Sequence, residues 1–499
     1  MHVVSYVKSS KFVFITFFAT LYILAILRYS SFHSHYYDLG IFQSNLYSIW
    51  NNGEWERAIT GHVQPLLLVY SFIYNIFGTN LGVYLLLATQ SFFLSVPVYM
   101  LGKIYKLNII IIYALFSGVW YAALFDFHID HLIVPLLTLV YIYMDRGDYK
   151  KVIAISLLIL LVKEPYSLVS LFVGFYLLLK RKPYHGMFLC VASIIYFYFT
   201  TTYILNVFTN TPVIPGSVSA YGWLGSSFLE IIHSVFFRLD DILVHIFTNK
   251  NKILFIVILL MSFSFYPVIS LVRLVPVIPL FALSLLSQLE NYYAYANHYM
   301  AAFAIPLLFS YIDTEKRINF YFYRKKITKY IKLLSLITPL IAHFLFSPSP
   351  ISRFFVDDKV YSWSYTSYIY DADHKEKISA LEQYIPEDPN VSISVQNPVN
   401  HGLLSNRVIY LSFPTGVIEP YTPPEYINRE KFVYVDNIYA DYVVIDMSKP
   451  WYLDDKSCSW IYGECTDFER GSNFMDSINK LSSSYDVIYQ KNSFFIYKI

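Results

Sequence analysis

Long apolar runs, separated by short loops that hold most of the lysines and arginines, fill residues 1–347 of the chain. Several runs approach or exceed the roughly 18 apolar residues that mark a helix crossing a bilayer. Only 14% of the 499 residues are charged, whereas about a quarter are charged in a soluble protein. The pattern predicts a multi-pass protein of the cell membrane with about eleven transmembrane α-helices.

The basic loops predict the orientation of these helices, because lysine and arginine are enriched in cytoplasmic loops. Lys8 and Lys11 precede the first helix, and the strongest basic cluster lies at 316–329. We therefore expect a cytoplasmic N-terminus, a transmembrane domain at 1–347 and an extracytoplasmic domain at 348–499. After a first helix ending near Tyr29, the expected spans are 81–102, 108–124, 131–145, 152–163, 165–180, 186–206, 253–270, 274–289, 298–312 and 328–347.

Two further apolar segments, 64–78 and 228–248, are expected to lie in the membrane interface as amphipathic helices. The first is short and begins at Pro65, and the second carries Arg238 and the pair Asp240-Asp241.

The extracytoplasmic part alternates between helix-like and strand-like segments. Helices are expected at 378–384 and 476–481, and strands at 391–396, 407–413, 440–446, 485–489 and 494–499, which predicts a small α/β domain. It shows no catalytic constellation. On the expected outer side, Cys458 and Cys465 could form a disulfide, and Asn390 begins an N-glycosylation triplet.

Polar residues gather at one depth in the predicted topology, at the outer edge of the membrane. Ionisable groups there are costly, so each is a candidate for function. The candidates come from four loops: Tyr37, Asp38, Gln43, His62 and Gln64; Asp126, His128, Asp130 and His131; Lys163 and Glu164; and Asn297, His298 and Tyr299.

Each of these loops also has a simpler interpretation. Asp38 could cap a helix beginning at the next residue. The residues of 126–131 could be a solvated turn, and Lys163-Glu164 could be an ion pair at a hairpin tip. His62 and His298 could be ordinary interfacial histidines. Their common depth favours a functional site.

The residue types suit the transfer of a group from a phosphate. A carboxylate can take the proton of an acceptor hydroxyl. A second carboxylate and histidines can hold a divalent metal such as Mg²⁺ or Mn²⁺, or act without one, and Lys163 could neutralise a leaving phosphate. The sequence has no Walker loop, Rossmann glycine pattern, zincin motif or serine-nucleophile elbow. Its basic residues are dispersed over short loops and give a net charge of +2, so the bilayer rather than nucleic acid is the expected partner.

Five short motifs, in this order, resemble an uncharacterised family of archaeal and bacterial membrane proteins, domain of unknown function 2079. They are Tyr37–Gln43, Gly61–Pro65, Phe125–His128, Leu161–Glu164 and Asn297–Tyr299. The resemblance runs from about residue 30 to the C-terminus. That family is in turn similar to the GT-C glycosyltransferases, which use sugars linked to polyprenyl phosphate.

The second resemblance implies a GT-C-like transmembrane fold and a role for single residues. Asp38 matches the catalytic base in the first outer loop of those enzymes. The Gly61–Pro65 stretch is similar to their Lys-Pro-Pro segment but has no lysine, and Lys163-Glu164-Pro165 is similar to their Thr-Lys-Gly-Pro hairpin with Glu in place of Gly.

The leading hypothesis is an inverting glycosyltransferase that moves sugar from a lipid phosphate to a glycan or protein of the cell envelope. Asp38 would be the base, and Asp126, His128, Asp130, His131, Lys163 and Glu164 would serve the donor phosphate or a metal. The substrate pocket would contain Tyr37, Gln43, His62, Gln64, Asn297, His298 and Tyr299. The alternatives are a transporter or flippase for a lipid-linked or small polar substrate, and a non-catalytic envelope scaffold.

Overall fold

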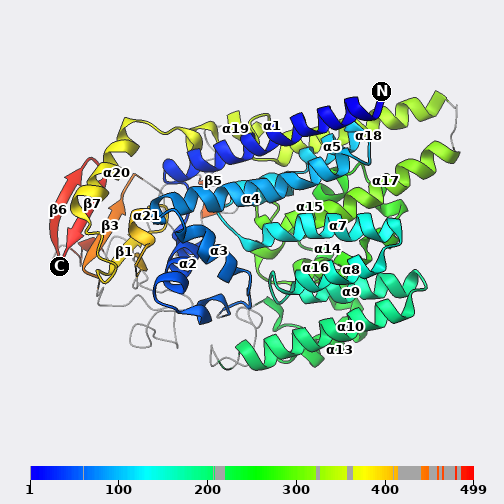
Figure 1. The fold of residues 1–499 in the computed structure, drawn as a ribbon, viewed down its shortest axis with the longest axis horizontal. Coiled ribbons are helices and arrows are strands. Elements are labelled where there is room, and N and C mark those ends of the chain that lie inside the picture. Colours follow the sequence, from blue (N-terminus) through cyan, green and yellow to red (C-terminus); the bar gives the residue numbers. More distant parts are fainter. Residues whose placement is uncertain are drawn as a thin grey trace.

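The computed structural model describes residues 2–59, 61–205, 207, 220–321, 326–356, 363–407, 410–413, 440–448, 458–459, 464–465, 478–479, 481 and 485–499. A helical bundle makes up most of it, and a small β-sheet lies at one end (Figure 1). The N-terminus lies at the opposite end of the bundle from the sheet, close to the ends of α17 (Ala304–Tyr321) and α18 (Lys326–Phe346).

Two long helices, α1 (His2–Ser30) and α4 (Thr79–Gly102), pack side by side along the bundle. The polar connection between α1 and α4 folds into short helices at the end of the bundle that is next to the sheet. These are a π-helical turn, η1 (Tyr36–Gly40), then α2 (Ile41–Asn51), η2 (Trp55–Ala58) and α3 (Leu67–Asn75). The segment expected at 64–78 is therefore a short helix of nine residues.

The following helices turn back and forth through the bundle: α5 (Leu107–Leu115), α6 (Ser117–Leu124), η3 (Ile129–Leu132), α7 (Ile133–Arg146), α8 (Tyr149–Leu160), α9 (Tyr166–Leu179), α10 (Pro183–Tyr198) and the π-helical η4 (Phe199–Ile204). The expected span 108–124 is two helices bent by 54°, because Phe116 between them has an extended backbone.

The second half of the bundle begins with α13 (Phe228–Phe237) and α14 (Leu239–Phe247), which replace the expected single helix at 228–248. The next elements are α15 (Lys250–Met261), η5 (Tyr266–Ile269), η6 (Leu271–Val277), α16 (Ile278–Leu286), η7 (Glu290–Tyr292) and η8 (His298–Phe303), before α17 and α18. Helix α14 meets α15 at 81°. Both α13 and α14 expose large apolar side chains, among them Leu229, Phe237 and Leu243.

Four helical segments are long and apolar enough to cross a membrane, by length and composition: Ser10–Ser30, Leu81–Gly102, Pro183–Ile204 and Ile327–Phe346. The count rises to six if each of two bent pairs forms one span, Leu107–Leu124 and Leu239–Met261. These counts concern the described residues. The expectation of eleven spans is not confirmed, because helices such as α8, α9 and α16 are shorter than a full crossing requires.

After α19 (Arg353–Val356) and η9 (Tyr365–Tyr368), the C-terminal domain begins with α20 (Ala372–Tyr384). Its remaining elements are β1 (Ile393–Gln396), α21 (Gly402–Ser405), β2 (Tyr410–Phe413), β3 (Tyr442–Asp446), β6 (Asp486–Lys491) and β7 (Phe494–Lys498). The sheet order is β2-β1-β3-β7-β6, with β1 parallel to β2 and β3 and with antiparallel pairing around β7. The expected strands are therefore present. Of the helix expected at 476–481, residues 478, 479 and 481 are described, and they are helical.

A separate hairpin contains β4 (Cys458–Ser459) and β5 (Glu464–Cys465), whose register places Cys458 opposite Cys465. Their side chains lie outside the described part of the chain, so the disulfide stays a prediction.

The first connection of the bundle contributes to the hydrophobic core of the C-terminal domain. Phe32 and Tyr36 are buried in one cluster with Ile393, Val395 and Leu404. The two parts of the chain therefore share a core at the sheet end of the bundle.

Candidate functional site

Asp38 lies in the π-helical turn η1, at the sheet end of the bundle. Its Oδ1 oxygen is 3.1 Å from Nε2 of His128, and its side chain remains 21% exposed. The following helix begins at Ile41 with Gly40 as its N-cap and has no side-chain capping bond. Asp38 is therefore not the cap of that helix, and its carboxylate faces a histidine from another loop.

The loop between α6 and α7 brings Asp126 and His128 to the same place. Gln90 of α4 fixes the loop at two points, because its amide donates to the Asp126 carbonyl at 2.6 Å and accepts from the His128 backbone N–H at 2.9 Å. Asp126 has a φ of +55°, a left-handed conformation that Asp tolerates better than most residues. Asp126, His128, Asp130 and His131 are all buried, so the interpretation as a solvated turn is wrong.

Three side chains form the described group that could hold a metal ion: His35, Asp38 and Asp126, whose ligating atoms lie within 4.8 Å of one another. The Asp126 Oδ2 oxygen also accepts the His35 backbone N–H at 2.8 Å. Burial raises the pKa of Asp126 and the Asp38 carboxylate raises it further, against the opposing effect of the His35 ring. A bound cation would relieve this repulsion.

The sequence placed His35 in the same outer loop as Asp38 but assigned it no role. His35 directly precedes the turn η1, three residues before Asp38, and that spacing was the available signal. Asp126 is the one residue of this three-residue group that the sequence predicted as a donor-phosphate or metal ligand.

A second cluster extends from His128 toward Lys163. The rings of His128 and His298 stack at a centroid distance of 3.6 Å, and the His298 ring contacts that of Tyr299 at 4.0 Å. Both ring nitrogens of the buried His298 have no hydrogen-bond partner among the described residues. Such buried polar atoms are costly unless water or a ligand satisfies them.

Asp130 links this cluster to Lys163. Its Oδ1 oxygen accepts the Tyr166 hydroxyl at 2.7 Å, and its Oδ2 oxygen is 3.8 Å from Nζ of Lys163. Burial acts to raise the pKa of Asp130, but the charges of Lys163 and of the histidines outweigh it and hold the pKa below its usual range.

Lys163 and Glu164 point to different partners. Glu164 is fully buried and accepts from Val63, whereas Lys163 faces Asp130. The other carboxylate oxygen of Glu164 is 2.6 Å from Nδ1 of His62. The interpretation of Lys163-Glu164 as a self-contained ion pair is therefore wrong.

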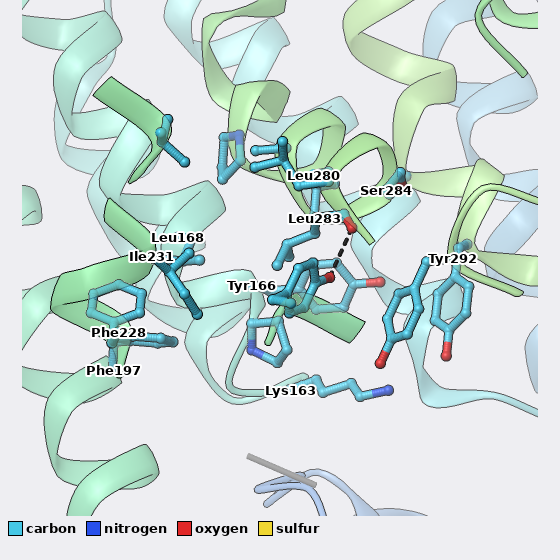
Figure 2. Close-up of a pocket in the computed structure, with 18 of the residues that line it drawn as sticks. Lys163, Tyr166, Leu168, Phe197, Phe228, Ile231, Leu280, Leu283, Ser284 and Tyr292 are labelled. Atoms are coloured by element: carbon cyan, nitrogen blue, oxygen red, sulfur yellow. Dashed lines mark hydrogen bonds between the residues drawn. The ribbon is translucent and has the colours of Figure 1, made fainter. Parts of the chain in front are cut away.

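A cavity of about 320 Å³ opens beside Lys163. Figure 2 shows Lys163 and Tyr292 at one end, and Leu280, Leu283 and Ile231 along the wall. The polar end is formed by His62, Asp130, Lys163, Tyr292 and Tyr299. The rest of the lining is mostly apolar and comes from α9, α10, α13, α16 and η8, including Leu168, Phe197, Phe228, Val235, Phe236, Ala282 and Phe303.

The cavity includes residues that the sequence did not single out as candidates. Tyr166 and Tyr221 line it, and the Tyr221 hydroxyl donates to the Leu283 carbonyl at 2.7 Å. Neither tyrosine gave a signal in the sequence, because the chain has 48 tyrosines and a single tyrosine is also typical of packing.

Other predicted site residues lie apart from the cavity. His131 is held between the Tyr70 hydroxyl and the His128 carbonyl. Gln43 faces the C-terminal domain, where its side-chain oxygen accepts from Asn400 at 3.0 Å. The buried Gln64 and Asn297 do not line the cavity, and the Asn297 amide donates to the Asn291 carbonyl at 3.1 Å.

The structure also leaves the predictions for Tyr37 and Asn390 untested. The side chain of Tyr37 lies outside the described part of the chain. Asn390 is exposed on the C-terminal domain, and its glycosylation stays a prediction.

A family model described as "Predicted membrane protein (DUF2079)" matches residues 28–436. No curated protein and no solved structure matches the chain. The match covers most of the helical bundle, the loops that carry Asp38, Asp126 and Lys163, and the first part of the C-terminal domain. The chain therefore belongs to the DUF2079 family of predicted membrane proteins.

Proposed function

We propose that this membrane protein is a glycosyltransferase whose donor is a sugar linked to a polyprenyl or dolichyl phosphate. The observation that carries the proposal is the cavity, which is apolar along its length and ends at Lys163. An isoprenoid chain fits an apolar wall, and a phosphate monoanion or dianion fits a single ammonium group with nearby hydroxyls.

A chain of contacts joins this polar end to Asp38. Tyr299 lines the cavity and touches His298, which stacks on His128. His128 in turn contacts the Asp38 carboxylate. A donor phosphate at Lys163 would therefore lie in the same polar region as a partly exposed carboxylate.

In the proposed reaction, Asp38 removes the proton from an acceptor hydroxyl. The acceptor oxygen forms a bond to the anomeric carbon, and the bond from that carbon to the phosphate oxygen breaks with its electron pair going to the phosphate. Lys163 stabilises the negative charge on the leaving lipid phosphate. His128 orients the carboxylate of Asp38.

His35, Asp38 and Asp126 fit a divalent cation such as Mg²⁺ or Mn²⁺, because they combine two carboxylates with one imidazole. A cation there would supply positive charge for the donor phosphate. His35 and Asp126 would hold it beside Asp38, with both carboxylates ionised.

Binding and transfer are tested separately on the protein in lipid nanodiscs. Polyprenyl monophosphate is the binding probe, and a panel of polyprenyl-phosphate sugars is the donor for transfer. We expect Lys163→Met to weaken binding of the probe at least about tenfold, whereas Lys106→Met, a change on the α4–α5 connection, leaves it unchanged. We expect Asp38→Asn to retain binding and to abolish transfer.

A fully active Asp38→Asn protein would overturn the assignment of the base. Equal binding by wild type and Lys163→Met would overturn the assignment of the cavity. Movement of polyprenyl phosphate between leaflets without a sugar would favour the flippase alternative.

A further inference from the structure

The turn that carries Asp38 is attached to the C-terminal domain at both of its ends. Tyr36 begins the turn and Gly40 ends it, and both contact residues 397–410. Asp38 lies between them and contacts His128 of the bundle instead. One short turn therefore contacts the C-terminal domain and contributes a carboxylate to the candidate site.

Tyr36 provides the first attachment. Its backbone N–H donates to the carbonyl of Asn397 at 2.9 Å, and its hydroxyl donates to the carbonyl of Tyr410 at 2.8 Å. Its ring also packs on that of Tyr410 at 4.8 Å. The side chain is almost fully buried, so these bonds are shielded from competing water.

Gly40 provides the second attachment through close packing. A Cβ atom at this position would lie 3.1 Å from both Oδ1 of Asn400 and the ring of Tyr410, which is closer than ordinary contact. Asn400 is itself fixed, because its amide donates to Gln43 at 3.0 Å and its oxygen accepts the Tyr410 hydroxyl at 3.0 Å. The C-terminal domain thus holds the turn and the start of α2.

The π-helical form of the turn makes this attachment relevant to the carboxylate. The Gly40 backbone N–H donates to the His35 carbonyl at 3.1 Å, five residues back. A π-helical turn is rare and often lies at functional sites. External contacts at both ends can maintain it.

We propose that the C-terminal domain acts as the positioning element for Asp38, with Tyr36 and Asn400 as its positioning residues. This inference rests on the proposed function for the role of Asp38 in transfer, but the attachment itself can be tested without activity. The domain would then set the orientation of the base rather than supply a reacting group. Misplacement of a reacting group by about 1 Å can cost on the order of a hundredfold in rate.

The test compares two tyrosines that make the same kind of bond. Tyr36→Phe removes a hydroxyl that donates to a buried carbonyl at 2.8 Å. Tyr485→Phe removes one that donates to the Ala440 carbonyl at 2.7 Å, and Tyr485 belongs to a different core cluster from Tyr36. Asn400→Ala is the second variant at the attachment. All are measured as full-length protein in nanodiscs.

In the transfer assay, we expect Tyr36→Phe and Asn400→Ala to lower kcat about tenfold at nearly unchanged donor KM. Tyr485→Phe should keep the kcat of the wild type, even where its melting temperature falls as much. Equal kcat values for Tyr36→Phe and Tyr485→Phe would overturn the positioning role.

Hydrogen–deuterium exchange of the peptide covering residues 35–41 gives the readout that needs no activity. We expect faster exchange in Tyr36→Phe and Asn400→Ala and wild-type exchange in Tyr485→Phe. Unchanged exchange in both attachment variants would overturn the inference. If the two attachment variants exchange faster than the wild type but the wild type transfers no sugar, the attachment is supported and the proposed function is rejected.

Discussion

The Oε1 oxygen of Glu164 lies 2.6 Å from Nδ1 of His62, and its Oε2 oxygen accepts the Val63 backbone N–H at 2.9 Å. This buried carboxylate joins the tip of the α8–α9 hairpin to the segment before α3. The neighbouring Lys163 is thereby left to face Asp130 and the cavity. Two adjacent charged residues have separate roles, one in the structure and one at the candidate site.

We expect Glu164→Ala to lower the free energy of unfolding by about 2 kcal/mol, because it leaves the Val63 N–H buried without an acceptor. Glu164→Gln should lose less, since its amide oxygen can still accept that bond. Thermal unfolding in detergent measures both. Glu382→Ala, an exposed change on α20, is the control, and a loss no larger than the control's would contradict the prediction.

A pair of salt bridges around Arg273 lies away from the candidate site. Arg273 in η6 donates to Asp145 of α7 and to Asp313 of α17, each at 2.6 Å. Arg273→Met should lower the free energy of unfolding by about 2–3 kcal/mol, because it leaves two carboxylates without their shared cation. Lys316→Met removes an exposed partner of Asp313 and should change stability by less than about 1 kcal/mol. Polyprenyl phosphate binding should be the same in both variants, and its selective loss in Arg273→Met would contradict a purely structural role.

Lipid binding should depend on the free volume of the cavity as well as on the charge of Lys163. Leu283 and Ile278 lie on the same helix, α16, but Leu283 lines the cavity and Ile278 is 46% exposed on the outside of the bundle. Leu283→Trp should fill the cavity and weaken binding of polyprenyl monophosphate at least about tenfold. Ile278→Trp should bind as the wild type does, because this exposed position does not line the cavity. Native mass spectrometry of the lipid complex measures both, and equal binding would place the lipid elsewhere.

Much of the local structure could be predicted from the sequence. Apolar runs bounded by basic residues located α1, α4 and α18, because a long apolar helix has few alternatives. In the C-terminal domain, β-branched runs such as that at 440–446 located the strands. The shorter helices were harder, since a run of suitable hydropathy does not reveal a bend such as the one at Phe116.

The candidate site could be predicted only as a set of loops. The motifs identified Asp38, Asp126, His128 and Lys163. Which of these side chains contact one another depends on the tertiary structure. Nothing in the local sequence indicates that Lys163 faces Asp130 or that Gln43 faces the C-terminal domain. The cavity was beyond prediction for the same reason, because its wall comes from helices more than 100 residues apart in the chain, from Leu168 to Phe303.

His401 lies at a contact between the bundle and the C-terminal domain that should depend on pH. His401 stacks on Tyr29 of α1 at 5.6 Å, and burial lowers the pKa of His401 from 6.5 to about 4. Between these two values the unfolded chain binds a proton at this position and the folded protein does not. Stability contributed by the neutral ring is therefore present above about pH 6.5 and is lost as the pH falls toward about 4.

His401→Asn removes this titration and keeps a good capping residue before α21. We expect the melting temperature of the wild type to fall between about pH 7 and pH 4.5 by more than that of His401→Asn. Differential scanning fluorimetry at the two pH values measures the difference. An equal fall in both proteins would mean that His401 is protonated in the folded state, and that its contact with Tyr29 does not depend on a neutral ring.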